Sequence, residues 1–102
     1  MNAIGPHIRQ IRVAAGMSLR STAKLAGVSA TYLSLVESGK AQTPTTDRLE
    51  RIAKAIHADS DDLVIRAGRV PSDVQAAIDR FPRKVTEVLR YTGVTKMKRV
   101  NL

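Results

Sequence analysis

The strongest constraint on the fold of this chain is a segment in which two short helical patterns each follow a serine and stop at a glycine. Ser18 and Ser29 suit the N-cap position, because a serine hydroxyl can accept a hydrogen bond from an otherwise unpaired amide of the first helical turn. Gly27 and Gly39 suit the left-handed conformation in which many helices end. The segment therefore predicts two helices joined by a tight turn, over residues 19–26 and 30–37.

The second of these predicted helices has two different sides. Leu33 and Val36 form its apolar side, to which Val28 in the turn adds. The opposite side is small and uncharged, and a slim face of this kind can enter the major groove of DNA. That side carries Ala30, Thr31, Ser34, Leu35 and Ser38, with Tyr32 near its border.

Further motifs continue the pattern over residues 4 to 68. They are Gly16-Met17-Ser18-Leu19-Arg20, Ala23, Gly27-Val28-Ser29, Tyr32-Leu33-Ser34, Glu37-Ser38-Gly39-Lys40, Pro44-Thr45, and the spaced series Leu49, Ile52, Ala53, Ala55 and Ile56. With these motifs the chain resembles the lambda-repressor-like helix-turn-helix proteins of the Cro/CI (Xre) family. The resemblance implies an all-α fold with a five-helix DNA-binding domain over residues 1–68, followed by one or two additional C-terminal helices. Thr22 departs from the family, which more often has Leu there, and Leu19 stands where some members have a phosphate-binding Gln.

Carried over residue by residue, the resemblance suggests which side chains contact DNA. Facing the bases we expect Ala30, Thr31, Ser34 and Leu35, with Tyr32 between the bases and the phosphates. Facing the phosphates we expect Ser18, Arg20, Ser29, Ser38 and Lys40, together with the loop residues Gln42 and Thr43 and the loop amides. The base-facing set contains no long bidentate donor. We therefore expect few direct hydrogen bonds to bases, and specificity from thymine methyl groups, half-site spacing and DNA shape.

Arg12 and Glu37 are the expected structural ion pair, because the family has such a pair between its first helix and the end of the recognition helix. An unpaired acid beside a DNA-facing helix would repel phosphate. The alternative is that Arg12 contacts a phosphate directly.

The remaining pattern predicts three more helices in the DNA-binding domain. The first runs from Pro6 to Ala15, since proline suits the first helical position. The fourth follows a Thr45 cap and buries a stripe made of Leu49, Ile52, Ala53 and Ile56. His57 is expected in the left-handed conformation, and Asp59 is expected to cap a fifth helix to about Ala67.

Beyond residue 68 we expect a helical extension over residues 69–93 and a basic tail over residues 94–102. Pro71 can open one helix to Arg80, and Pro82 can open another to Tyr91, with Phe81 between them. Their apolar residues can either add to the core of the domain or form a two-fold dimer interface, which we favour because a five-helix domain already has a core. The expected interface consists of Val74, Ile78, Phe81, Val85, Val88 and Leu89. The tail can be disordered, contact DNA as an arm, or pair as an edge strand.

Composition narrows the classes of function. Of 102 residues, 17 are Lys or Arg and 9 are Asp or Glu, and this net charge of +8 favours a polyanionic partner. The chain has 3 aromatic residues, too few for a platform that stacks single-stranded bases. Without Cys it has no disulfide framework, and His7 and His57 lack neighbouring ligands, so we expect no metal and no cofactor. We also see no signal peptide and no membrane-length apolar run, and expect a cytoplasmic protein.

The function that this sequence predicts is a transcriptional regulator that binds double-stranded DNA. Its simplest form is a homodimeric repressor on an inverted-repeat operator, with half-sites about 10 bp apart. The alternative is an antitoxin whose C-terminal helices bind a toxin, or more generally a regulator with a protein partner such as an antirepressor. We expect no enzyme activity, because the chain lacks a nucleophile–base pair, a Gly-rich phosphate loop and a metal set.

Overall fold

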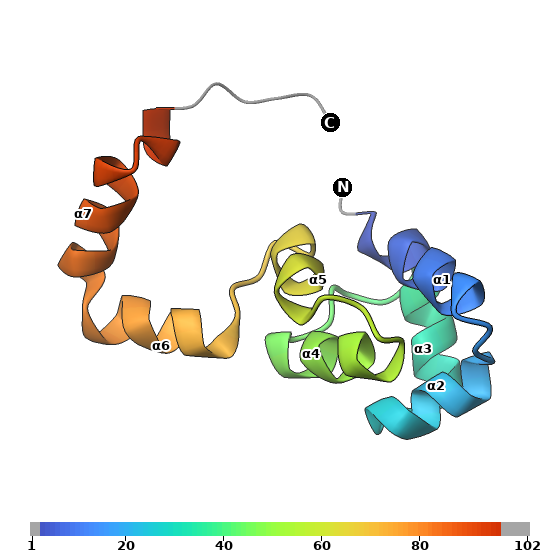
Figure 1. Ribbon diagram of the computed structural model, residues 1–102. Coiled ribbons are helices and arrows are strands. Elements are labelled where there is room, and N and C mark those ends of the chain that lie inside the picture. The colour runs from blue at the N-terminus through green and yellow to red at the C-terminus, as the bar shows by residue number, and fades with distance from the viewer. Residues whose placement is uncertain (1–2, 97–102) are drawn as a thin grey trace. The chain divides into compact units, whose positions relative to one another are not determined.

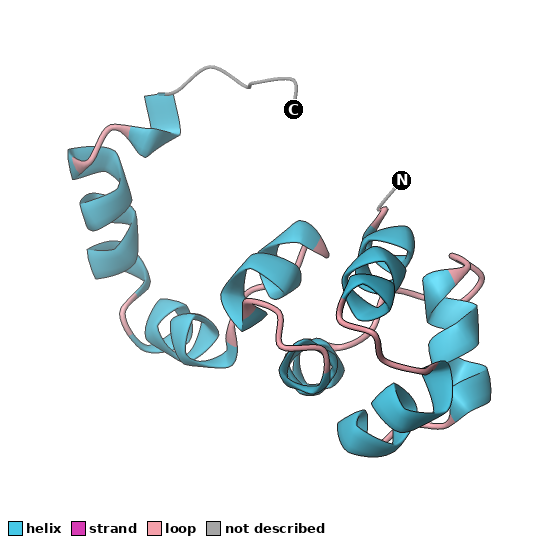
Figure 2. Cartoon of the chain, turned by 45° about the vertical axis from the view of Figure 1, so that its right-hand side comes forward, coloured by secondary structure: helices cyan, strands magenta, loops and turns pink. Residues whose placement is uncertain are grey.

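The computed structural model describes residues 3–96, and all regular structure in that range is helical, as Figures 1 and 2 show. The helices are α1 (Ile4–Ala14), α2 (Leu19–Ala26), α3 (Ala30–Glu37), α4 (Thr46–Ala55), α5 (Ser60–Arg66), α6 (Ser72–Arg80) and α7 (Pro82–Tyr91), followed by the 3-10 turn η1 (Val94–Lys96). The expected all-α fold is confirmed. None of the helices in residues 3–96 is long and apolar enough to span a bilayer. The predictions for the tail beyond residue 96 lie outside the described residues.

Side-chain caps set the starts of four helices, as the sequence predicts. In each case the capping side chain accepts a hydrogen bond from the backbone amide three residues on. The distances are 3.1 Å for Ser18, 3.0 Å for Ser29, 3.4 Å for Thr45 and 3.0 Å for Asp59. Gly27 ends α2 with φ 69°, Gly39 follows α3 with φ 75°, and His57 follows α4 with φ 58°, so the three predicted left-handed positions are confirmed. These local interactions fix α2 and α3 at the predicted residues.

The start of α1 differs from the prediction. The helix begins at Ile4, not at Pro6, which occupies its third position. Proline is tolerated there because the first amides of a helix have no partner within it, so the missing N–H of Pro6 leaves no hydrogen bond unmade. Smaller shifts occur at α5, which ends at Arg66, and at α6, which begins at Ser72 immediately after Pro71.

Helices α1 to α5 enclose one apolar core. α2 packs against α3 and α4, α1 against α3, and α4 against α5. The predicted stripe of α4 is buried, and the largest fully buried apolar side chains are Ile8, Leu33, Leu49, Ile52, Ile56, Leu63 and Val64. Thr22 is also fully buried, and its hydroxyl has no hydrogen-bond partner in the described part of the chain. An unpaired buried hydroxyl is unfavourable by about 1–3 kcal/mol.

At Gly5, α1 lies against the backbone at the end of α3. A Cβ atom at this position would collide with the carbonyl oxygen of Val36 and lie 3.0 Å from that of Glu37. The end of α3 therefore rests on a helix surface that only glycine provides. This contact helps to hold α3 in place from the side opposite its exposed face.

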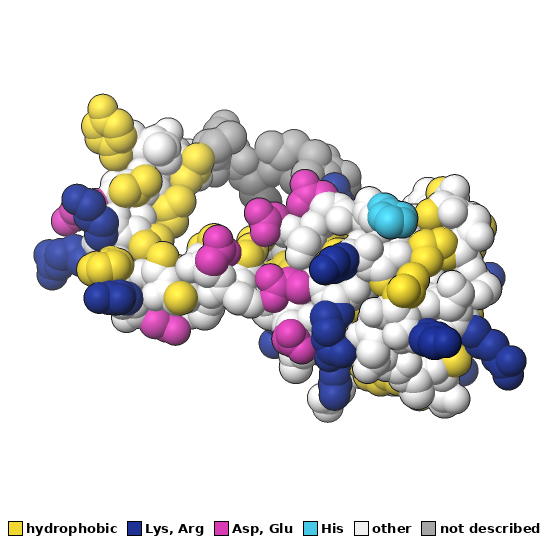
Figure 3. Space-filling view, turned by 60° about the horizontal axis from the view of Figure 1, so that its bottom comes forward, with side chains coloured by type: hydrophobic (Ala, Val, Ile, Leu, Met, Phe, Trp, Pro, Cys, Tyr) yellow, Lys and Arg dark blue, Asp and Glu magenta, His cyan; other side chains and the backbone are white. Residues whose placement is uncertain are grey.

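Residues 73–96 belong to a second compact unit, distinct from the unit that contains residues 3–72. Phe81 leaves the helical conformation with φ −133°, and Pro82 opens α7, as expected. Neither α6 nor α7 contains a buried residue. Exposed apolar side chains are visible in the space-filling view (yellow in Figure 3). The large exposed apolar residues of these helices include Val74, Phe81, Val88 and Leu89.

Candidate nucleic-acid interface

The turn between α2 and α3 is built from backbone bonds around Gly27. The amides of Gly27 and Val28 donate to the carbonyls of Lys24 and Ala23, at 3.2 and 3.0 Å. The half-buried Val28 packs against the core from within the turn. These contacts give α3 a fixed direction relative to α2, which is the requirement for a helix that is presented to a ligand.

The two faces of α3 separate as the sequence predicts. Leu33, Val36 and Glu37 are buried. The outward positions hold Thr31, Ser34, Leu35 and Ser38, all exposed, and Ala30 and Tyr32 are half-buried at the edge of this face. The Ser38 hydroxyl donates to the Leu35 carbonyl at 3.2 Å, so it is turned toward its own helix. The outward face is thus slim, free of charge and partly apolar.

The side chains expected to contact phosphate lie around this face, and most are exposed. Ser18, Arg20, Ser29, Lys40 and Gln42 are exposed, and Thr43 is half-buried. Two backbone amides of the loop after α3 already have partners within the chain. The amides of Lys40 and Ala41 both donate to the Leu35 carbonyl, at 2.9 and 3.1 Å, so these two amides are engaged within the fold.

Arg12 and Glu37 form a part-buried, bidentate ion pair. Arg12 donates from Nε to Oε2 at 2.7 Å and from Nη2 to Oε1 at 2.9 Å, and its Nη1 donates to the Met17 carbonyl at 2.8 Å. The hydrogen bond and charge of Glu37 raise the pKa of Arg12 above its ordinary value, although burial acts in the opposite direction. The pair joins α1, the segment before α2 and the end of α3. Arg12 is therefore engaged within the fold, in contrast to the alternative of a direct phosphate contact.

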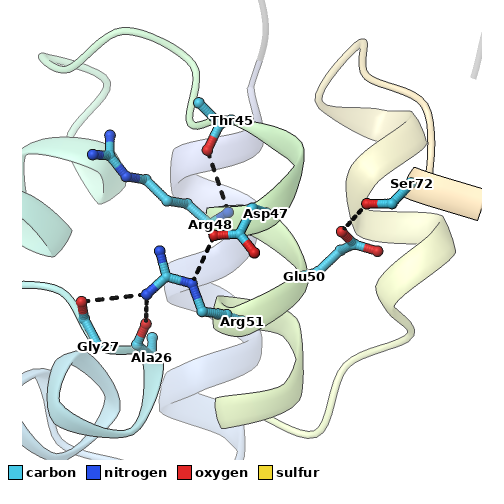
Figure 4. A network of polar contacts seen from close by, with 8 residues as sticks. All are labelled: Ala26, Gly27, Thr45, Asp47, Arg48, Glu50, Arg51 and Ser72. Carbon is cyan, nitrogen blue, oxygen red and sulfur yellow. Dashed lines mark hydrogen bonds and ion pairs between the residues drawn. The ribbon is translucent and has the colours of Figure 1, made fainter. Parts of the chain in front are cut away.

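Three arginines that the sequence did not single out also shape this region. Arg51 donates from Nη1 to the carbonyls of Ala26 and Gly27, at 2.8 and 3.3 Å, and pairs with Asp47 at 3.1 Å, as Figure 4 shows. The four-residue spacing of Asp47 and Arg51 could have predicted their pairing, but the carbonyl contacts depend on how α2 packs against α4.

Arg48 contacts a side chain of α3, and Arg69 contacts the loop that follows this helix. The Arg48 guanidinium lies 5.1 Å from the centre of the Tyr32 ring. Arg69 donates to the carbonyls of Pro44 and Thr43, at 3.0 and 2.9 Å, and so holds the loop that follows α3. Neither contact has a short-range sequence signal, because each joins residues far apart in the chain.

Charge on the domain is mixed. In Figure 3, which faces α2 and α4, Lys and Arg side chains are spread over the surface with acidic side chains among them. Within residues 3–96, no group of three His, Asp or Glu residues is arranged to hold a metal ion. The shape and the hydrogen-bonding groups of the candidate interface are therefore more distinctive than its charge, because basic side chains do not form one continuous patch in this view.

Sequence comparison gives a consistent assignment. The family model described as a helix-turn-helix domain matches residues 3–67. An uncharacterised HTH-type transcriptional regulator of Mycobacterium tuberculosis is 42% identical over 76 residues, which is 74% of this chain and 54% of the relative. The chain thus spans about half the length of this relative. The HTH-type transcriptional regulator RghRB of Bacillus subtilis is 25% identical over 99 residues, covering 94% of this chain and 70% of the relative.

Solved structures show the same fold. The clp gene regulator ClgR of Corynebacterium glutamicum matches with a TM-score of 0.57 and 31% identity, over 66% of this chain and 86% of the other. The complex of SinR protein with SinI protein matches with a TM-score of 0.56 and 24% identity, over 93% and 99% of the two chains. The second likeness extends the agreement in fold to most of the chain.

Proposed function

Because the chain belongs to the Cro/CI-like helix-turn-helix family of DNA-binding transcriptional regulators, we propose that it acts as a homodimeric repressor that binds an inverted-repeat operator through α3. The observation that carries this proposal is the outward face of α3. Thr31, Ser34 and Leu35 point away from the core on a helix whose other side is anchored by the Arg12–Glu37 pair. Repression follows most simply from occupancy of the operator, and we propose no catalytic step.

The chemistry of this face suggests how the DNA is read. The methyl group of Thr31 and the side chains of Ala30 and Leu35 can contact thymine methyl groups in the major groove. The hydroxyls of Thr31 and Ser34 can bond to either kind of base edge, directly or through water. We therefore propose that sequence preference rests on apolar contacts and DNA shape, with few bidentate hydrogen bonds.

Thr31→Val and Lys40→Gln test this assignment by affecting different properties. Thr31→Val keeps the shape of the side chain but replaces its hydroxyl with a second methyl group, so we expect the base preference at one position of each half-site to shift toward thymine. Lys40→Gln removes a phosphate contact, so we expect weaker binding to all duplexes and a salt slope of log K reduced by about 1. Systematic selection of bound duplexes, followed by titration at two salt concentrations, measures both effects. The opposite pattern, in which Lys40→Gln changes preference and Thr31→Val does not, would contradict the orientation proposed for α3.

The proposed homodimer rests on the open apolar side chains of α6 and α7. A soluble protein rarely leaves such a set uncovered without a partner surface. Two copies related by a two-fold axis would place two α3 helices about 10 bp apart on one side of the duplex. The residues proposed for this interface are Val74, Ile78, Phe81, Val85, Val88 and Leu89.

Leu89→Ala is expected to weaken self-association, because the lost burial of most of a leucine side chain corresponds to about tenfold or more in the dimer dissociation constant. Glu87→Ala is the matched control, since it truncates a side chain on the opposite face of the same helix. Sedimentation velocity over a range of concentrations measures the dissociation constants, and footprinting shows whether one or both half-sites are protected. The dimer proposal would be contradicted if the two variants had the same dimer dissociation constant. It would also be contradicted if the wild type were monomeric and still protected both half-sites.

A further inference from the structure

A groove beside the amino end of α3 has the character of an anion site. It is lined by the turn residues Gly27, Val28 and Ser29, by Tyr32 of α3, and by Arg48 and Arg51 of α4. Two arginines of α4 therefore line the same groove. They differ in how much of their hydrogen-bonding capacity is already used.

Arg51 is committed to the fold. Its Nη1 donates to the carbonyls of Ala26 and Gly27, and its Nε pairs with Asp47 at 3.1 Å. In Figure 4 its side chain points toward these carbonyls at the end of α2. Arg51 thus donates hydrogen bonds to two carbonyls at the end of this helix and holds the turn against α4.

Arg48 is held in place but not paired. Its guanidinium lies over the Tyr32 ring, 5.1 Å from the ring centre, and within residues 3–96 no carboxylate forms an ion pair with it. The aromatic face fixes the position of a cation without occupying its N–H donors. Figure 4 shows the side chain extending away from α4, in a direction different from that of Arg51. Such a preorganised, unpaired guanidinium is suited to a bidentate oxyanion.

We infer that Arg48, positioned by Tyr32, binds a backbone phosphate of the DNA strand that borders the amino end of α3. This inference rests on the proposed function, in which α3 enters the major groove. The N-terminal residues of a recognition helix approach the base edges, so groups beside that end lie against the groove wall, which is formed by phosphates. Arg48 belongs to α4 and is not part of the outward face of α3, which makes it a sequence-independent contact.

Ser29 supplies a second donor to the same phosphate. Its hydroxyl oxygen accepts a hydrogen bond from the Tyr32 amide at 3.0 Å, which leaves the hydroxyl proton available to donate. The Ser29 cap and the Arg48 guanidinium are both tied to Tyr32, one through its amide and the other through its ring. Tyr32 therefore acts as a positioning residue for two phosphate donors as well as lying at the edge of the base-facing surface.

Arg48→Gln, Arg48→Lys and the matched control Lys54→Gln test this site in the full-length chain. Lys54 is an exposed cation of the same helix, so its removal changes the net charge equally without affecting the groove. The probe is a duplex of about 20 bp, in one version carrying the selected site and in another a shuffled sequence. Affinities for both are measured over a series of salt concentrations, and thermal unfolding checks that each variant is folded.

The expected result is that Arg48→Gln weakens binding to both duplexes by about tenfold at about 0.1 M salt and lowers the salt slope by about 1. Arg48→Lys is expected to keep the salt slope, because the positive charge remains. It is expected to bind more weakly than the wild type, because lysine lacks the planar guanidinium that can bind a phosphate through two hydrogen bonds. Lys54→Gln is expected to leave the slope unchanged.

Two results would overturn the inference while leaving DNA binding intact. The first is that Arg48→Gln has the same salt slope of log K as the wild type or as Lys54→Gln. The other is a loss confined to the selected duplex, which would make Arg48 a base-reading residue. A wild type that binds the selected and shuffled duplexes equally well would instead refute the proposed function, and one that binds neither would refute both.

Discussion

Replacing Gly5 with alanine is expected to lower the free energy of unfolding by about 3 kcal/mol, because the new methyl group would collide with the backbone at the end of α3. Helix propensity alone predicts that the free energy of unfolding would rise, since alanine is favoured over glycine inside a helix by about 1 kcal/mol. Chemical denaturation of the wild type and of Gly5→Ala therefore shows whether helix propensity or the steric clash determines the change in stability. The obstructing atom is a carbonyl oxygen of α3, so relief requires α1 and α3 to move apart.

Gly16→Ala provides the comparison for this variant. Gly16 has φ +70° and no atom within 4 Å of the position a Cβ would occupy, so only backbone strain opposes the change. A loss of about 1 kcal/mol is expected there. If Gly5→Ala were as stable as the wild type, the close packing of α1 on α3 would be wrong. If its loss merely equalled that of Gly16→Ala, the steric explanation would fail.

Replacing Glu37 with glutamine is expected to lower the free energy of unfolding by about 3 kcal/mol, because it leaves Arg12 charged and part-buried without its counter-ion. The side chains of Arg12 and Glu37 are only 12% and 6% exposed, so water replaces little of the lost interaction. Urea denaturation measures the effect. The double variant Arg12→Met/Glu37→Met is expected to recover much of the loss, since two apolar side chains leave no buried charge.

Asp62→Asn is the matched control for Glu37→Gln, because it removes the charge from a carboxylate that pairs with Arg66 on the surface. The two side chains of that pair are 50% and 58% exposed, and such pairs contribute about 0–1 kcal/mol. A Glu37→Gln variant no less stable than Asp62→Asn would show that the Arg12–Glu37 pair does not stabilise the domain.

The sequence was sufficient to predict those parts of the fold that short-range interactions determine. Ser18, Ser29, Thr45 and Asp59 cap helices as expected, since each cap involves residues only three positions apart. The start of α1 was misplaced because Pro6 is acceptable at several positions of a first turn. Which of these positions it takes depends on the packing of Ile4 and Gly5 against the core.

The candidate site was predictable in its outward face but not in its supporting contacts. Alternation of apolar and small polar residues along α3 indicates which side is buried, and Leu33 and Thr31 lie as expected. The contacts of Arg48 with Tyr32 and of Arg51 with Ala26 arise only when α4 packs beside the helix-turn-helix. The DNA contacts themselves stay predictions, because they depend on a duplex and on the spacing of two copies.

The hydrogen bonds of Arg69 bear on where the DNA-binding part of the chain can be cut. The family match ends at residue 67, yet Arg69 binds the carbonyls of Thr43 and Pro44, Val70 accepts a bond from the Thr46 hydroxyl, and Ser72 donates to Glu50. An excised fragment that stopped at the end of the match would release the segment leading out of α3. The shortest fragment that retains all of these hydrogen bonds ends at Ser72.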